Sequence, residues 1–114
     1  MAGLTKPQLK AFKKALETRR KELMKVHDAT AEARAPVELD QTTQGRLSRM
    51  DALQVQAMAL ETDRRRELEI QRIDHALERI ADGEFGYCIT CGEEIDRKRL
   101  DYDAAIPTCI DCAH

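Results

Sequence analysis

The only four cysteines of the chain stand in two pairs near its end. Cys88 and Cys91 form the first CxxC pair, Cys109 and Cys112 form the second, and the 17 residues 92–108 separate them. Two CxxC turns at this separation can direct four thiolates to one centre, which is the ligand set of a tetrahedral zinc site. Because four thiolates complete the coordination of zinc, the spacing predicts one structural zinc ion without an open position for catalysis.

The residues around the cysteines fit the same interpretation. Gly92 follows the first pair and is expected to take a positive φ, which turns backbone N–H groups toward sulfur. Arg97, Lys98 and Arg99 stand between the pairs, and their charges are expected to offset the net negative charge of zinc with four thiolates. His114 is expected to be a terminal residue and not a further ligand.

Two disulfide bonds are the alternative use of the cysteines. Disulfides persist in oxidising compartments, whereas the first 20 residues contain no apolar run that could act as a signal peptide. No later segment is apolar enough to span a membrane. The sequence therefore favours reduced cysteines in a cytoplasmic protein that has no contact with a membrane.

Two long helices are expected to precede the cysteines. Thr5 is placed to cap the first, with Pro7 in the first turn and Gln8 completing a capping box, and Pro36 ends it. Along both helices apolar residues recur three or four positions apart, as in helices that bury one face against each other. This stripe comprises Leu9, Phe12, Leu16, Leu23 and Val26, then Leu47, Met50, Leu53, Ala57, Leu60, Ile70, Ile73, Leu77 and Ile80.

The predicted fold is all-α, a long antiparallel helical hairpin (coiled coil) with a small four-cysteine zinc-finger module at its base. The hairpin occupies residues 1–82 and the module residues 83–114. Within the hairpin we expect the first helix over about 6–34, the tip over about 35–40 and the second helix over about 41–82.

The register of the hairpin follows from the expected turn. A turn centred near residue 37 or 38 places residue i opposite about residue 75 minus i, so Leu4 is expected to face Gln71. The end of the second helix would then overhang the first and pack on the finger. In the middle, the stretch ETDRRRELE interrupts the apolar pattern, so the seam is expected to loosen or shift there, with His27 as a seam or surface histidine.

Charge and motif content exclude several classes of function. Residues 1–34 carry nine Lys or Arg against four Asp or Glu, and the remainder carries ten against seventeen. A basic segment that faces an acidic partner within one chain is partly neutralised, which disfavours a general nucleic-acid binder. Because the sequence contains no phosphate loop, Ser-His-Asp set or paired-carboxylate cleft, we do not expect an enzyme.

The segments GEFGYCITCGEEI and PTCIDC, with Arg99–Leu100 and the long charged helix before them, resemble the DksA/TraR family of bacterial zinc-finger transcription regulators. The resemblance implies a protein that binds RNA polymerase directly, inserts its hairpin into the secondary channel and needs no sequence-specific DNA contact. The acidic tip motif of that family, DxxDxA, has no counterpart here. The candidate tip residues are Asp40 first, Glu38 second and Asp51 third, each with capping, solvation or ion pairing as its structural alternative.

Some members of that family bind guanosine tetraphosphate through basic residues of the second hairpin helix and the finger. Arg65 and Arg72 occupy two of these positions and are the candidate phosphate contacts. Glu69 stands between them, Asp103 replaces a basic finger residue and Ala113 replaces the lysine after the last cysteine. The added negative charge favours ion pairs on the helix surface over nucleotide binding.

Other functions remain open at this level. A nucleic-acid-binding zinc protein would use the basic first helix and the RKR stretch at residues 97–99, although the chain lacks interleaved aromatic residues for stacking on bases. A coiled-coil adaptor would use the hairpin as a partner surface, and a zinc-thiolate redox sensor would release its metal on oxidation. The polymerase-binding regulator is the leading hypothesis.

Overall fold

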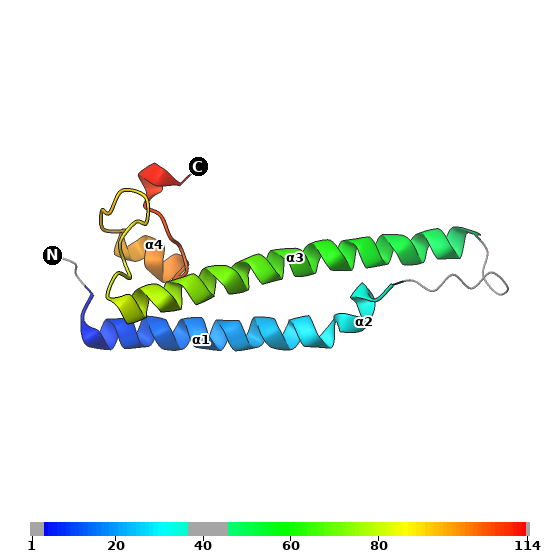
Figure 1. The fold of residues 1–114 in the computed structure, drawn as a ribbon, viewed down its shortest axis with the longest axis horizontal. Coiled ribbons are helices and arrows are strands. Elements are labelled where there is room, and N and C mark those ends of the chain that lie inside the picture. Colours follow the sequence, from blue (N-terminus) through cyan, green and yellow to red (C-terminus); the bar gives the residue numbers. More distant parts are fainter. Residues whose placement is uncertain (1–3, 37–45, 114) are drawn as a thin grey trace.

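The computed structural model describes residues 4–36 and 46–113, and within them the fold is a helical hairpin with a small module packed at one end (Figure 1). The helices are α1 (Lys6–Ala29), α2 (Ala31–Arg34), α3 (Arg46–Asp82) and α4 (Arg97–Tyr102), followed by a 3₁₀ turn at Ile110–Cys112. The molecule measures 68 × 27 × 20 Å. The predicted all-α hairpin with a zinc-finger module at its base is confirmed.

The ends of the helices follow from local sequence. The predicted capping box is present: the Thr5 side chain accepts from the Gln8 N–H, and the Gln8 side chain accepts from the Thr5 N–H. At the same end of the hairpin, α3 stops at Asp82 because Gly83 turns the chain with a φ of 78°. The second helix therefore ends at residue 82, where its predicted bounds placed its end.

The first helix is not continuous to residue 34 as predicted. It breaks at Thr30, whose hydroxyl donates to the Val26 carbonyl oxygen at 2.8 Å and whose backbone has a φ of −104°. A threonine that hydrogen-bonds back to the preceding turn competes with the helical ladder. The four residues of α2 continue the arm after this break.

The predicted tip falls mostly outside the described residues. Glu38 and Asp40 lie there, as do residues 41–45, where the second helix was expected to begin. The division of the chain between residues 82 and 83 stays a prediction.

The register of the hairpin differs from the prediction. Arg19 pairs with Glu69, Arg20 with Asp74 and His27 with Asp63, so facing residue numbers add to about 90 and not to 75. The midpoint of the hairpin therefore lies near residue 45. The prediction was wrong because it assumed a tight turn directly after Pro36, whereas 11 residues separate the end of α2 from the start of α3.

As a result of this register, α1 extends to the base of the hairpin, the end nearest the finger, and the predicted overhang of the second helix is absent from the described residues. The rings of Phe12 and Phe85 lie 5.4 Å apart, which joins α1 to the finger directly. Ile73 of α3 is buried in the same core, as expected. The buried core residues are Phe12, Leu16, Leu23, Ile70, Ile73, Ala76, Phe85, Cys88, Ile95, Leu100 and Ala105.

Farther from the finger, the predicted apolar stripe of the second helix is not buried. Met50, Leu53 and Leu60 are 58%, 45% and 48% exposed. The face turned toward α2 instead carries the less exposed residues Ala52, Gln56 and Ala59, and Gln56 donates to the Ala35 carbonyl oxygen at 2.6 Å. This face is in phase with Asp63, Arg66, Ile70 and Ile73, which continue it toward the finger at three- and four-residue spacing.

Replacing Gly86 by alanine tests the contact between the start of the chain and the finger. Gly86 has a φ of 96°, and a Cβ there would lie 3.0 Å from Leu4 Cδ1. We expect Gly86→Ala to lower the free energy of unfolding by about 1–2 kcal/mol in urea titrations, because an L side chain disfavours this backbone conformation. Gly83→Ala is the matched control, since its φ is 78° with nothing within 4 Å of the new Cβ.

The comparison separates backbone strain from the Leu4 contact. We expect Gly86→Ala to cost more than Gly83→Ala, and the difference to disappear when Leu4 is also replaced by alanine. Equal stability of Gly86→Ala and the unchanged protein would contradict the described packing.

Candidate metal centre

The four cysteines converge on one point of the finger. Their sulfur atoms all lie within 4.8 Å of one another, and Cys91 Sγ is 3.6 Å from Cys109 Sγ. Tetrahedral zinc with Zn–S bonds of about 2.3 Å requires sulfur atoms about 3.8 Å apart. The spacing of the sulfur atoms therefore fits a zinc ion, and the cysteines are not joined by disulfide bonds.

Backbone hydrogen bonds hold the two CxxC turns in place. Gly92 has the predicted positive φ, 78°, and its N–H donates to the Cys88 carbonyl oxygen at 2.9 Å. The Thr90 N–H donates to Cys88 Sγ at 3.4 Å. The Ile89 N–H donates to the Pro107 carbonyl oxygen at 2.9 Å and so ties the first turn to the segment before the second.

The thiols are close enough to oppose one another's ionisation when no cation is bound. Burial raises the pKa of Cys88, but N–H groups of Cys109, Cys91 and Thr90 outweigh burial and lower this pKa to about 6. Its thiol neighbours raise the pKa of Cys112 to about 12. Cys88 therefore loses its proton easily, whereas Cys112 keeps its proton as long as the other thiols are its only neighbours. All four cysteines can be ionised together only beside a cation, and a divalent metal ion provides that positive charge.

The basic residues between the pairs do not act as one group on the metal centre. Arg97 was expected to offset its charge, but Arg97 pairs with Asp101 at 3.0 Å and lies 5.1 Å from the centre of the Phe12 ring. Arg99 donates to the Thr108 carbonyl oxygen at 3.0 Å, next to Cys109. The Phe12 ring of α1 and the Asp101 carboxylate of α4 (Arg97–Tyr102) therefore both engage the Arg97 guanidinium.

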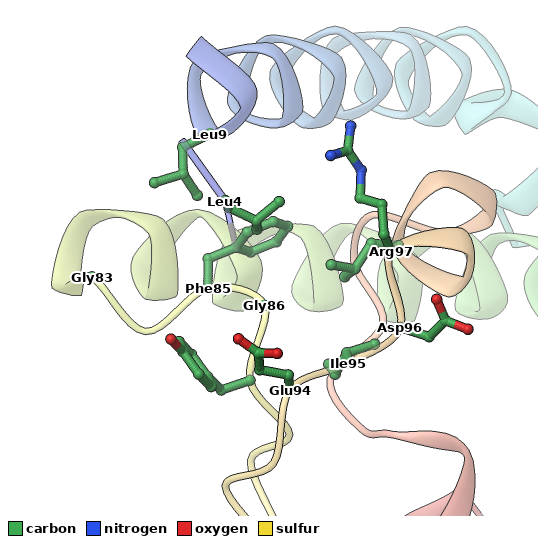
Figure 2. A pocket seen from close by; sticks show the side chains of 11 residues that line it. Leu4, Leu9, Gly83, Phe85, Gly86, Glu94, Ile95, Asp96 and Arg97 are labelled. Atoms are coloured by element: carbon green, nitrogen blue, oxygen red, sulfur yellow. The ribbon is translucent and has the colours of Figure 1, made fainter. Parts of the chain in front are cut away.

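A cavity of about 480 Å³ lies where the start of the chain meets the finger (Figure 2). Leu4 and Phe85 both line it, and the Arg97 side chain, which also lines it, extends toward α1. Asp96 caps α4 by accepting from the Lys98 N–H at 3.2 Å. These contacts fix the orientation of the finger relative to the hairpin.

The candidate phosphate contacts are engaged in ion pairs. Arg72 donates to Asp103 of the finger at 2.8 Å, and Arg65 pairs with Glu61 at 3.4 Å. Glu69, which was expected to lie between them as their partner, pairs with Arg19 of α1 at 2.8 Å. Arg65 is 77% exposed, and its ion pair lies within α3, whereas that of Arg72 joins α3 to the finger.

A buried charged cluster crosses the seam where the apolar pattern was interrupted. Asp63 is 4% exposed and accepts from His27 Nδ1 and Arg66 Nη1, each at 2.8 Å, with Arg34 Nη1 at 3.3 Å. His27 is therefore a seam histidine, as expected. Asp63 was not identified from the sequence as a buried residue. It could have been, because residues 59, 63, 66, 70 and 73 are three or four positions apart and therefore share one face of the helix.

The remaining tip candidate, Asp51, is exposed in the second turn of α3. Because the midpoint of the hairpin lies near residue 45, Asp51 is nearer to the tip than the predicted turn at residues 35–40 implied. Within the described residues, no helix combines the length and the apolar character needed to cross a membrane.

Comparisons with known proteins identify relatives of both the finger and the whole chain. The model of the prokaryotic dksA/traR C4-type zinc finger matches residues 83–114. With the geometry above, this match shows that Cys88, Cys91, Cys109 and Cys112 hold one structural zinc ion. That ion has four protein ligands and serves the fold of the finger.

Longer alignments extend the similarity to the hairpin. The RNA polymerase-binding transcription factor DksA of Salmonella typhimurium is 33% identical over 118 residues, which cover 96% of this chain and 71% of that protein. DksA of Escherichia coli K12 is 44% identical over 50 residues, which cover 44% of this chain and 32% of that protein. The structure of transcription factor DksA2 from Pseudomonas aeruginosa superimposes with a TM-score of 0.78 at 26% identity, over 96% of this chain and 83% of that one.

Proposed function

The chain belongs to the DksA/TraR family of zinc-finger transcription regulators, and we propose from this that it binds RNA polymerase directly and regulates transcription. The observation that carries the proposal is the alignment with the polymerase-binding factor of Salmonella typhimurium, because it includes the hairpin as well as the finger. The role is non-catalytic, and the protein acts in the cytoplasm with the polymerase.

The proposed mode of binding places the hairpin in the secondary channel of the polymerase. The hairpin is narrow and is packed on the finger at one end only, so its other end projects from the metal-stabilised base (Figure 1). The apolar core that would stiffen this base is shared by α1, α3 and the finger. A rigid base with a projecting arm suits insertion into a channel.

The acidic residues near the tip are proposed to act close to the active site of the polymerase. Asp51 is an exposed acidic residue of α3 in the tip-proximal half, defined here as α2 and residues 46–62 of α3. Asp40 and Glu38 remain candidates from the sequence. Arg72 is engaged by Asp103, so the proposal does not include guanosine tetraphosphate as a ligand.

The proposal predicts competition between this protein and its relative for polymerase. Zinc-loaded protein is expected to retain purified bacterial RNA polymerase in a pull-down, and an excess of DksA from Salmonella typhimurium is expected to displace it, because both would occupy the secondary channel. Retention without competition would contradict insertion in the channel. Failure to retain polymerase would contradict direct binding.

Replacement of the acidic tip candidates then separates binding from regulation. Asp40→Ala, Glu38→Ala and Asp51→Ala are each tested in a transcription assay with purified polymerase, with the affinity measured in parallel. The functional acid is expected to be the one whose loss abolishes the effect with affinity retained. Asp82→Ala is the matched control, since Asp82 is an exposed aspartate at the other end of α3. Unchanged regulation by all three variants would contradict an acidic tip.

A further inference from the structure

A buried nitrogen of Arg79 has no hydrogen-bond partner among the described residues. Arg79 Nη2 is shielded from solvent, and no acceptor lies within hydrogen-bonding distance of it. Leaving a charged donor buried and unsatisfied is costly, so a group of this kind requires an explanation. Arg79 lies in the last turn of α3, where its own carbonyl oxygen accepts from the Glu84 N–H at 2.8 Å.

Arg79 borders a cavity that the first cysteine of the metal centre also lines. Arg79 and Cys88 line the same cavity of about 350 Å³, together with Gly83, Glu84, Tyr87 and Ile89. Cys88 is the buried cysteine of the four, at 3% exposure. The guanidinium and the buried thiolate therefore share a region from which water is partly excluded.

The other arginines of the finger region have partners of their own. Arg97 is held by Asp101, Arg72 by Asp103, and Arg99 donates to the Thr108 carbonyl oxygen. Among the described residues, no ion pair joins Arg79 to Glu78 or Glu84. Arg79 thus retains an unused donor in a residue that lines the same cavity as Cys88, and Glu78 acts on its charge only at a distance, without an ion pair.

We propose that Arg79 is the electrostatic partner of the zinc–thiolate centre on its Cys88 side, and that it is a positioning residue for metal binding. A zinc ion with four thiolates has a net charge of −2, which acts strongly on a cation in a poorly hydrated region. Groups beyond the direct ligands commonly determine metal affinity in this way. The charge of the centre compensates the buried guanidinium even without a direct N–H···S hydrogen bond.

This arrangement couples metal binding to the end of α3. Without zinc, the partly buried charge of Arg79 is opposed by that of Arg72 and offset only by that of Glu78, and with zinc it gains the charge of the metal centre. Removing the charge of Arg79 should therefore weaken zinc binding specifically. A purely structural role of Arg79 would instead depend on its shape and would not distinguish a retained charge from a lost one.

The test compares charge-removing and charge-retaining variants of the full chain. Zinc affinity is measured by competition with a chromophoric chelator, with far-UV circular dichroism as the check on helix content. Arg79→Gln is expected to bind zinc about 10-fold to 100-fold more weakly. Arg79→Lys keeps the charge and is expected to stay on the order of threefold from the unchanged protein. Arg65→Gln, an exposed change of the same charge on α3, is the matched control and is expected to have no effect.

Two further measurements make the outcome decisive. The charge-transfer band from sulfur to cobalt in the Co²⁺-loaded protein is expected to shift in Arg79→Gln and not in Arg65→Gln. Equal zinc affinity of Arg79→Gln and Arg65→Gln, or equal weakening by Arg79→Gln and Arg79→Lys, would overturn the proposal. So would stabilisation of the zinc-loaded unchanged protein, but not of Arg79→Gln, by inorganic phosphate, because the cavity would then serve a dissolved anion.

Discussion

Replacing Cys109 by serine is expected to abolish stoichiometric zinc binding and to unfold the finger. Structural zinc sites of this kind contribute about 10–16 kcal/mol of apparent binding free energy in zinc-finger peptides, which exceeds the stability of most small domains. Because Phe85, Ile95 and Leu100 share one core with Phe12 and Ile73, the base of the hairpin should lose order together with the finger. Zinc content by mass spectrometry and thermal unfolding by circular dichroism measure both effects.

Ile89→Ala is the control for the loss of zinc. Ile89 adjoins Cys88 but is 63% exposed, so its truncation should leave the zinc content unchanged and the melting temperature nearly so. A Cys109→Ser protein that retained one zinc ion per chain and melted like the unchanged protein would contradict a four-cysteine structural site.

Replacing Asp63 by alanine is expected to be the most destabilising single change in the hairpin seam outside the apolar core. The change leaves Arg34 and Arg66, each with a side chain 15% exposed, without their common carboxylate. Breaking a buried ion pair from one side leaves an uncompensated charge, and we expect the free energy of unfolding to fall by about 3 kcal/mol. Urea unfolding at neutral pH, followed by circular dichroism, is the measurement.

Asp74→Ala is the matched control for that prediction. Asp74 pairs with Arg20 across the same two helices at 2.6 Å, but both side chains are 41% exposed. An exposed pair contributes about 0–1 kcal/mol, so this variant should unfold close to the unchanged protein. Equal losses of unfolding free energy in Asp63→Ala and Asp74→Ala would contradict the prediction that the buried ion pairs of Asp63 stabilise the hairpin more than the exposed pair of Asp74.

The dependence of stability on pH provides a second measurement of the Asp63 cluster. Burial acts to raise the pKa of Asp63, but hydrogen bonds from His27 and Arg66 and the charge of Arg34 outweigh it and lower this pKa from its ordinary value of 3.8. A carboxyl with a lowered pKa stabilises the fold fully above its unfolded pKa and loses that contribution as the pH falls toward the lowered value. Asp63→Asn should therefore show a weaker loss of stability below pH 3.8 than the unchanged protein.

Local features of the fold could be predicted because neighbouring residues control them. The capping box at Thr5 depends on residues three positions apart, and the stop at Gly83 depends on one residue that tolerates a positive φ. The CxxC pairs identified the metal ligands for a similar reason, since each pair needs only its own short turn. These were the features for which sequence spacing and physical contact coincide.

The register of the hairpin could not be predicted in this way. It depends on how many residues the chain uses between its two arms, and a proline marks where a helix ends but not how long the connection is. The wrong turn position misplaced every pair of facing residues and produced the predicted overhang. For the same reason, the contact between Phe12 of α1 and Phe85 of the finger was not predicted.

Which face of α3 is buried could not be predicted from the spacing of apolar residues either. Two series of residues at helical spacing run along the second helix, offset by about one residue, and periodicity identified the one with the larger apolar side chains. The series that faces α2 and α1 contains Gln56 and Asp63, whose burial is favourable because Ala35, His27 and Arg34 supply partners from the other arm. It also contains Arg66, which pairs with Asp63 on α3 itself. Amino-acid spacing thus sufficed for the helical hairpin and its zinc ligands, whereas the roles of Asp63 and Arg79 depend on distant residues that folding brings beside them.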